Sequence, residues 1–310
     1  MTNKDKYIAF CETRDDIPIF SEPWWLDAVC VDGSWDVCIV EKNGIIQATL
    51  PYYQTKLKGL SVIRMPLLTP YLGVQFFSNK HISSAKNSQS AIKNTEQLVE
   101  QLPKVAFLQQ VHSPEFLNWL PFYWMGFNQT TMYTYHLDIK DTDVVYKGFR
   151  QNLKRNLKSA QSDLICKESE DLDLFYKINK TTFDRQGLSI PYSFDFLRNL
   201  DTILKEKEKR KIFISYDKNG NALASGYYAW DNQKAYYLAG GHSGNREAMS
   251  WTMWQAIQYF STKVQVFDFE GSMIKNIAHY FSGYGASLIP YHHITKGKNK
   301  MINILKILKS

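Results

Sequence analysis

The sequence has 310 residues, of which 44% are hydrophobic and 15% aromatic, so it can build a large core and does not have the composition of a disordered chain. The length suits two domains. The net charge of +7 at pH 7 favours acidic partners such as phosphates, nucleic acid or an anionic membrane surface. The four cysteines show no CxxC or metal-ligand spacing, which argues against a disulfide framework and a metal site. No signal peptide or membrane span is visible, so we expect a cytoplasmic protein.

Strands and tight turns dominate the first half of the chain. Trp35–Val40 and Ile45–Tyr53 are expected strands, joined at Asn43-Gly44 by a strong hairpin signal. No glycine-rich turn leads into a helix here, so we expect this half to be a scaffold or to hold an acceptor. The other elements expected in it are a helix over Ser90–Leu102 and strands over Val105–Val111 and Thr130–Leu137.

Pro66–Val74 differs from its surroundings because prolines interrupt a strand pattern. Such a segment is usually an edge strand or a loop. It could also be a substrate-contacting loop in which Thr69 and Tyr71 supply hydrogen bonds. The sequence leaves both interpretations open.

The polar connector Asp138–Asp143 is the expected domain boundary, which gives an N-terminal domain over residues 1–138 and a C-terminal domain over residues 139–310. A helix is expected over Thr142–Ser162. Its basic stripe is either a solvated face or a surface that binds phosphates of transfer RNA, coenzyme A or lipid. The residues of the stripe are Lys147, Arg150, Lys154 and Lys158.

Further helical and strand patterns follow. A helix over Leu172–Arg185 is stopped by Gly187. Arg185 could pair with the neighbouring Asp184. The chain ends in a basic tail with apolar residues at helical spacing over residues 296–308. The strands expected before the next stretch are Lys211–Tyr216 and Ala222–Trp230.

The most informative stretch combines a strand, a glycine-rich turn, a helix and a second strand. The strand Ala235–Ala239 precedes the turn, and a helix begins near Arg246 with Asn245 or Ser243 as its N-cap. The turn is either an ordinary βα corner or a phosphate site, because a helix N-terminus presents unpaired N–H groups. The residues assigned to a phosphate site are Gly240, Gly241, Ser243, Gly244, Asn245 and Arg246.

A carboxylate is expected at the same edge of the sheet. Val264–Phe269 should lie parallel to Ala235–Ala239 and is followed by Glu270. Ligands bind beyond the carboxyl ends of strands in open α/β sheets. An anion site beside a carboxylate suits transfer of an acyl group from a phosphate-bearing carrier to an amine. Alternatively, Glu270 only stabilises the dipole of a helix that starts near Met273.

The chain resembles the FemAB-type proteins and their acyltransferase relatives, which have tandem N-acetyltransferase (GNAT) folds. The resemblance implies two GNAT-like domains, each a mixed α/β sheet flanked by helices, and it places Arg185 against an anion or carboxylate in a cleft. Family members often carry Lys or Arg where this chain has Ser282, which argues against aminoacyl-tRNA as the donor. The matching segments are Arg150–Lys158, Thr182–Ser193, Gly240–Ser250 and Phe267–Ala286, with Pro66–Val74 as a weaker match.

Acyl transfer needs a bound carrier, donors for an oxyanion and a base near the amine. We expect Glu270 to be the base or acceptor anchor, His242 to be the second candidate, and Tyr237 or Tyr284 to donate a proton. The expected donor is acyl-CoA, no metal is expected, and the acceptor is a small-molecule or cell-envelope-precursor amine. The alternatives are an aminoacyl-tRNA-dependent ligase of cell wall biogenesis and a non-catalytic binding protein. Transfer RNA and a membrane contacted through basic residues are further candidate partners.

Overall fold

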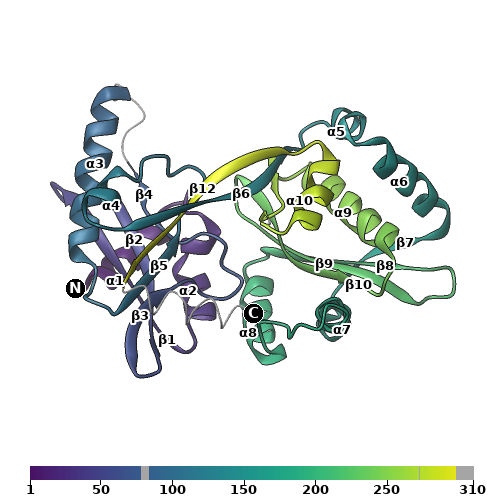
Figure 1. Ribbon diagram of the computed structural model, residues 1–310, viewed down its shortest axis with the longest axis horizontal. Coiled ribbons are helices and arrows are strands. Elements are labelled where there is room, and N and C mark those ends of the chain that lie inside the picture. The colour runs from purple at the N-terminus through teal and green to yellow at the C-terminus, as the bar shows by residue number, and fades with distance from the viewer. Residues whose placement is uncertain (78–83, 272, 298–310) are drawn as a thin grey trace. The chain divides into compact units, whose positions relative to one another are not determined.

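The structure is a computed structural model that describes residues 1–77, 84–271 and 273–297 (Figure 1). Its α-helices are α1 (Asn3–Glu12), α2 (Pro23–Val29), α3 (Ser84–Gln101), α4 (Leu120–Trp124), α5 (Thr142–Gly148), α6 (Gln151–Asp163), α7 (Leu172–Asp184), α8 (Phe194–Glu206), α9 (Arg246–Phe260) and α10 (Lys275–Phe281). Its strands are β1 (Gly33–Lys42), β2 (Ile45–Leu57), β3 (Leu60–Arg64), β4 (Gln75–Phe76), β5 (Phe107–Val111), β6 (Asn128–Asp138), β7 (Ile165–Ser169), β8 (Arg210–Tyr216), β9 (Ala222–Trp230), β10 (Lys234–His242), β11 (Val266–Asp268) and β12 (Ser287–Gly297). Within these ranges no helix is long and apolar enough to cross a bilayer.

The chain folds into two compact units. One is Met1–Met132 together with the C-terminal residues from Pro290, and the other is Tyr133–Ile289. The second unit therefore starts a few residues before the expected connector, and the end of β12 groups with the first unit because His293–Gly297 pairs antiparallel with β5. The expected basic tail lies outside the described residues from position 298 onward.

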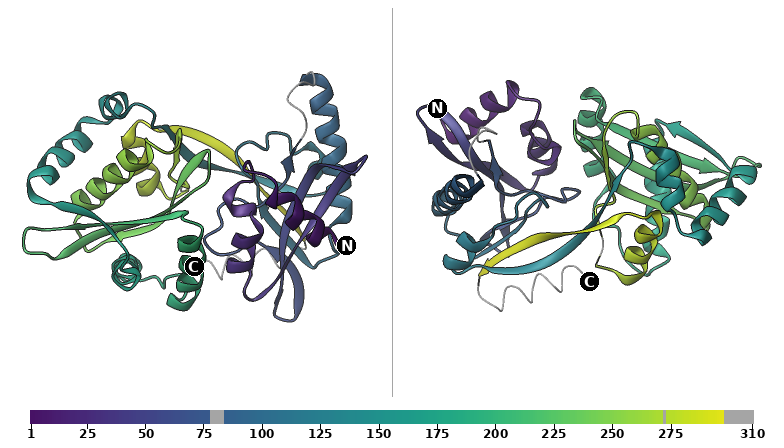
Figure 2. Two further views of the ribbon diagram at one scale, coloured as in Figure 1. Left: turned by 180° about the vertical axis from the view of Figure 1, so that it is seen from behind. Right: turned by 90° about the horizontal axis from the view of Figure 1, so that it is seen from above.

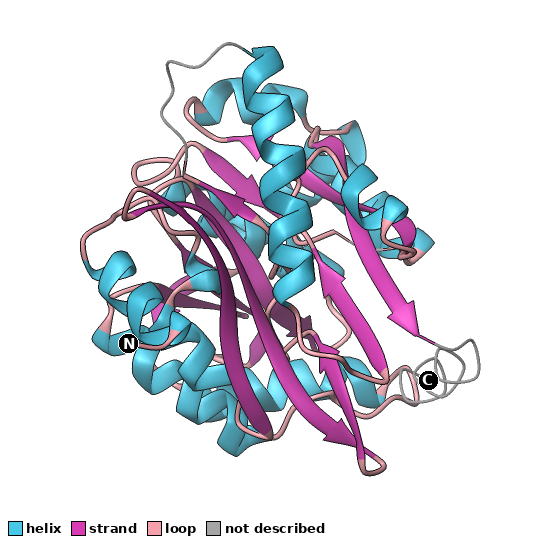
Figure 3. Ribbon diagram, turned by 90° about the vertical axis from the view of Figure 1, so that its left-hand side faces the viewer, coloured by secondary structure: helices cyan, strands magenta, loops and turns pink. Residues whose placement is uncertain are grey.

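The first unit contains a mixed sheet in the order β1-β2-β3-β5-β12, with β4 beside β2. Strands β3 and β5 are parallel, and the other neighbours are antiparallel. The β1–β2 hairpin turns at Asn43 and Gly44, whose φ angles are 53° and 77°. Positive φ at both positions is what a two-residue hairpin turn requires, so the expected hairpin is confirmed. Helix α3 packs against β1, β2 and α4, and Figure 3 shows helices lying against the strands in the view from the side of this unit.

The second unit contains a sheet in the order β6-β11-β10-β9-β8-β7. Strands β10 and β11 are parallel and the remaining neighbours are antiparallel. This arrangement confirms the strand–helix–strand unit expected from the sequence, with α9 as the crossover. Helices α6 and α9 lie on one face of the sheet and α7 and α8 on the other, as Figure 1 and the rear view in Figure 2 show.

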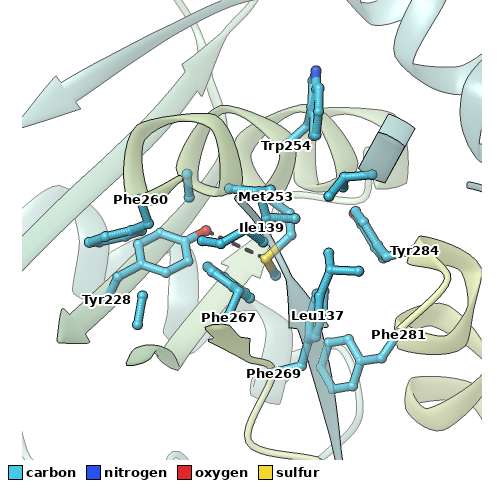
Figure 4. Packing of buried hydrophobic residues seen from close by; sticks show 14 of the residues in the cluster. Leu137, Ile139, Tyr228, Met253, Trp254, Phe260, Phe267, Phe269, Phe281 and Tyr284 are labelled. Carbon is cyan, nitrogen blue, oxygen red and sulfur yellow. Dashed lines mark hydrogen bonds between the residues drawn. The ribbon is translucent and has the colours of Figure 1, made fainter. Parts of the chain in front are cut away.

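An aromatic core fixes these elements together. Met253 and Phe260 of α9 are fully buried against Phe267 of β11 and Tyr228 of β9. Figure 4 shows these side chains pointing toward one another, with the Tyr228 hydroxyl donating to Met253 Sδ at 3.9 Å. Large rings supply much of the buried apolar area of such a core. The ends of β10 and β11 are therefore held on a closely packed base.

The prediction of a single helix over Thr142–Ser162 is wrong, because the structure has two helices there, α5 and α6. Phe149 and Arg150 have extended backbone, with ψ angles of 146° and 151°, and separate α5 from α6. Phe149 turns into the core against Trp254, with 5.1 Å between ring centroids. The Arg150 N–H donates to the carbonyl of Gly283 at 2.9 Å. Tertiary packing thus overrides a continuous helical pattern.

Candidate active site

Strands β10 and β11 pair over only three residues and then separate. Their last paired residues are Tyr236 and Asp268, after which β11 ends and β10 continues to His242. A register shift between Tyr237 and Ala239 marks a bulge against β9 just beyond this point. In the part of the chain that the structure describes, the rest of β10 has no partner strand on the β11 side. Glu270 follows the last residue of β11 by two positions and therefore lies where the two strands separate.

Glu270 is held in an uncommon backbone conformation. Its φ is 58°, in the left-handed region that costs a non-glycine residue about 1 kcal/mol or more. Its N–H donates to Oδ1 of Asp268 at 2.8 Å, which fixes this turn. The next residue, Gly271, also has positive φ, and a Cβ there would lie 2.1 Å from the carbonyl oxygen of Tyr133. The close contact with β6 therefore leaves no room for a side chain at 271.

The carboxyl group of Glu270 lies in an environment that disfavours its charge. Its Oε1 atom is inaccessible to solvent and has no hydrogen-bond partner among the described residues. Burial raises the pKa of Glu270 well above its ordinary value, and the negative charge of Asp268 raises it further. Glu270 therefore keeps its proton to a higher pH than an exposed glutamate.

Asp268 is tuned in the opposite direction. Burial by itself raises its pKa, but hydrogen bonds and charge from His136, the Thr134 hydroxyl and the Glu270 N–H together lower it. His136 Nε2 lies 3.0 Å from Oδ2 of Asp268, and Thr134 Oγ1 donates to Oδ1. Neighbouring carboxyl groups with pKa values moved apart are typical of acid–base sites.

His136, Thr134 and Asp268 were not predicted from the sequence as residues of the site. Thr134 and His136 alternate along β6, so they lie on one face of that strand. His136 is directly opposite Asp268 in the antiparallel β6–β11 pair. The alternation is visible in the sequence, but the pairing joins residues more than a hundred positions apart and leaves no local signal.

A cationic group of residues lies at the other end of β10. Asn245 caps α9 by accepting from the Ala248 N–H at 2.9 Å, which confirms the helix start near Arg246. Arg185, just after α7, places its guanidinium 3.4 Å from Nδ1 of His242. Arg185 and Arg246 are exposed. Two guanidinium groups and the N-terminus of a 15-residue helix are thus available to an anion here.

Arg185 does not use its neighbour Asp184 as an ion-pair partner among the described residues. Asp184 pairs instead with Lys180 at 2.8 Å, one turn earlier in α7. Ser243 is also occupied, because its hydroxyl donates to the carbonyl of Leu223 at 3.2 Å. The guanidinium of Arg185 thus lies beside His242 rather than in an ion pair with Asp184.

His242 is a neutral imidazole at pH 7. Burial and, to a smaller extent, the charges of Arg185 and Arg246 together lower its pKa to about 4. The Gly244 N–H donates to its Nδ1 at 3.2 Å, so this nitrogen accepts. A base with so low a pKa removes a proton from an ammonium group poorly at neutral pH. The carboxyl group of Glu270, with its raised pKa, is better matched to that step.

Gly240 and Gly241 belong to β10, which continues to His242, so the prediction that the strand ends at Ala239 is wrong. They pair with β9, and the side-chain amide of Asn179 in α7 donates to the Gly240 carbonyl at 2.7 Å. A Cβ on Gly241 would lie 2.5 Å from Oγ1 of Thr182 and 2.8 Å from the Cα of Asn179. The glycines thus allow α7 to approach β10 closely, and the exposed corner consists of residues 242–246.

The two candidate tyrosines occupy different environments. Tyr237 on β10 is half-buried, and burial raises its pKa, with Tyr280, Tyr192 and Glu270 adding to the rise. Its hydroxyl occupies the space that a Cβ on Gly240 would take, 2.3 Å from that position. Tyr284 is fully buried, and its hydroxyl lies 2.8 Å from that of Tyr280. Tyr237 is thus close enough for the charge of Glu270 to affect its pKa, whereas the hydroxyl of Tyr284 pairs with that of the partly buried Tyr280.

Thr69 and Tyr71 belong to the first unit, where both are buried in an irregular segment. Thr69 Oγ1 accepts from the indole N–H of Trp25 at 3.0 Å. Tyr71 packs edge-on against Tyr291, with ring centroids 5.4 Å apart. The segment is a loop, which agrees with one of the two interpretations of Pro66–Val74, and these contacts stabilise it internally. No cluster of three or more metal-ligating side chains occurs in the described ranges.

Comparisons with known proteins place the fold. No protein-family model and no curated protein matches the sequence. A solved structure of FemX is 14% identical, covers 98% of both chains and superposes with a TM-score of 0.69. The structure of L-PGS from Bacillus licheniformis is 12% identical over 99% of this chain and 96% of its own, with a TM-score of 0.58. A tandem GNAT protein from the clavulanic acid biosynthesis pathway is 10% identical over 86% and 83%, with a TM-score of 0.50. The chain therefore has a FemAB-like fold of two GNAT-like units, as expected from the sequence.

Proposed function

We propose that this protein transfers an acyl group from a phosphate-bearing carrier to an amine, with Glu270 as the base. The observation that carries the proposal is the buried, unpartnered carboxyl oxygen of Glu270 at the separation of β10 and β11. An amine acceptor is an ammonium ion at neutral pH and must lose a proton before it attacks. A carboxylate with a raised pKa accepts that proton more readily than an ordinary glutamate does.

The covalent step balances with the residues at hand. The amine nitrogen attacks the carbonyl carbon of the carrier's thioester or ester, a C–N bond forms, and the C–S or C–O bond breaks. Glu270 takes the proton of the ammonium ion and passes it to the leaving sulfur or oxygen, and the second proton that the nitrogen loses on forming the amide goes to solvent. N–H groups of β10 beyond Tyr236, on the side that β11 has left, are the donors available to the developing oxyanion.

The carrier's phosphates are assigned to the corner at the end of β10. Arg185, Arg246 and the N-terminus of α9 supply positive charge there, and all lie on elements anchored in the second unit. Acyl-CoA is the donor that we favour because the part of β10 that has separated from β11 runs from beside Glu270 to this corner. The acceptor is an amine of a small molecule or of a cell-envelope precursor.

One observation keeps aminoacyl-tRNA as a second candidate donor. Ser282 itself is uncharged, but a positive charge lies beside it, because the guanidinium of Arg150 donates to its hydroxyl at 2.9 Å. Arg150 precedes α6, whose exposed basic residues could follow an RNA backbone. The charge that the family resemblance implies at position 282 is thus present, but it comes from Arg150, between α5 and α6.

A thermal-shift panel with coenzyme A, several acyl-CoAs and transfer RNA tests the proposal. For acyl-CoA, we expect a saturable rise in melting temperature that Arg185→Ala reduces and Arg150→Ala leaves unchanged. A rise with transfer RNA that depends on Arg150 would assign the second donor. If neither ligand shifts the melting temperature and no acylated amine forms, the chain is not a transferase of this kind.

A further inference from the structure

A short segment of the first unit carries no charged side chain and presents apolar groups on both of its sides. Residues 116–127 read FLNWLPFYWMGF. Phe116, Phe122 and Phe127 are buried in the core of this unit. The other side of the segment is exposed, and we call it the α4 patch. Its members, with their exposed fractions, are Leu117 (81%), Leu120 (44%), Tyr123 (59%) and Trp124 (56%).

The buried phenylalanines hold the α4 patch in place. Phe122 packs edge-on against Phe116 and Phe127, with centroid distances of 6.0 and 5.2 Å. Helix α3 packs on α4, which is visible in Figure 1. The exposed rings therefore project from an anchored turn, and their positions cost little conformational entropy when they bind.

The size and composition of the α4 patch favour a lipid surface over a second copy of the chain. Its four side chains expose roughly 500 Å², taking about 150–250 Å² for each aromatic ring and less for each leucine. A stable dimer buries about 800 Å² on each partner, so the patch alone falls short. Tryptophan and tyrosine with leucine, free of charge, are the residues that settle at the boundary between headgroups and acyl chains.

A lysine borders the α4 patch. The ammonium group of Lys296, on β12, donates to the carbonyl of Met125 at 2.8 Å and lies 4.5 Å from the ring centroid of Phe127. The sequence after Gly297 contains four more lysines and no acidic residue, in a chain with a net charge of +7. Positive charge beside an apolar patch is complementary to an anionic bilayer.

We propose that the α4 patch is a membrane-interface site that inserts Leu120, Tyr123 and Trp124 into the headgroup region of an anionic bilayer. This membrane contact does not depend on acyl transfer. The composition suggested a membrane contact through basic residues alone, whereas the contact proposed here is made by apolar side chains. It would bring the first unit to a surface where lipid-linked substrates are concentrated.

Vesicle flotation of the full chain tests the site. The probes are vesicles of phosphatidylcholine with about 30% phosphatidylglycerol and, separately, of phosphatidylcholine alone. The test variant combines Leu120→Ser, Tyr123→Ser and Trp124→Ser, and Trp124→Ser alone serves if the combination melts early. The matched control combines Ile45→Ser and Leu60→Ser, which removes two apolar side chains of similar exposure elsewhere in the same unit. A further variant replaces Lys298, Lys300, Lys306 and Lys309 by glutamine.

We expect the wild-type chain and the control to float with anionic vesicles, and the patch variants to lose about tenfold or more of this binding. The lysine variant should bind anionic vesicles more weakly than the wild type. Adding the patch substitutions to the lysine variant should weaken its binding further. The proposal is overturned if the patch variants bind as the wild type does, or if only the lysine variant abolishes binding. It is equally overturned if the patch substitutions convert a dimer to a monomer in chains that never bind vesicles.

Discussion

Replacing Glu270 by glutamine separates a catalytic role from a structural one by the sign of the stability change. The folded state raises the pKa of Glu270 above its unfolded value of about 4.3. The protonated carboxyl is therefore favoured in the fold, and this stabilisation is fully present below the unfolded pKa and is lost as the pH rises through the folded pKa. Glutamine resembles the protonated carboxyl and never ionises. Above the folded pKa, Glu270→Gln should be more stable than the wild type, and near pH 4 the two should be alike.

The expected magnitudes are measurable. Each unit by which the folded pKa exceeds the unfolded value corresponds to about 1.36 kcal/mol. In a domain of the size of Tyr133–Ile289, about 1 kcal/mol moves the melting temperature by ~2–4 °C. A rise of at least about 3 °C per unit is therefore expected at high pH. Loss of a general base should at the same time lower turnover by about 10²-fold or more.

Melting temperatures at pH 4 and pH 9, together with turnover, provide the assay. Glu206→Gln is the control, because it removes the same charge from an exposed helix end, and it should change neither quantity appreciably. If Glu270 only interacted with the dipole of the following helix, the glutamine variant would lose about 1 kcal/mol or less of its free energy of unfolding, melt at a lower temperature and keep full activity. That helix, α10, begins at Lys275 rather than near Met273, which places Glu270 outside its first turn. A lowered melting point at pH 9 with wild-type turnover would refute the catalytic assignment.

Three further changes test the surroundings of Glu270. Asp268→Asn removes a neighbouring negative charge, so the pKa of Glu270 should fall and the acidic limb of the pH profile of kcat/KM should move to lower pH. Arg185→Ala should raise the Kd for coenzyme A about tenfold in calorimetry, as expected for a charged hydrogen bond, whereas Lys177→Ala, on the same helix, should not. Gly241→Ala should lower stability in urea by about 1–3 kcal/mol, because its Cβ would overlap the backbone of α7; an unchanged midpoint would contradict this packing role.

Local patterns in the sequence were sufficient for the central strand–helix–strand unit. The helix from Arg246 and its cap at Asn245 follow from residues within one turn of each other. The parallel pairing of β10 and β11 follows from chain order, since a crossover helix joins parallel neighbours. These elements were predicted because each depends on contacts that are short-range in the sequence.

The failures share a physical cause in long-range packing. Gly240 and Gly241 look like turn residues, but α7 needs their missing side chains, and α7 lies some sixty residues earlier. The break at Phe149 occurs because its ring packs against α9, on a distant part of the chain. Neither contact leaves a trace in the local pattern of hydrophobic residues.

The site itself was predicted only in part for the same reason. Glu270 was identified as the residue that follows a buried strand, but its backbone turn is held by Asp268, and its pKa is raised by burial and further by the charge of Asp268. Asp268 in turn keeps its charge because β6 brings Thr134 and His136 to it. One aspartate thus holds the turn that positions Glu270 and supplies a charge that adds to the rise in the pKa of Glu270. Two adjacent carboxyl groups whose pKa values are moved in opposite directions are typical of proton-transfer sites, and this arrangement supports the role proposed for Glu270.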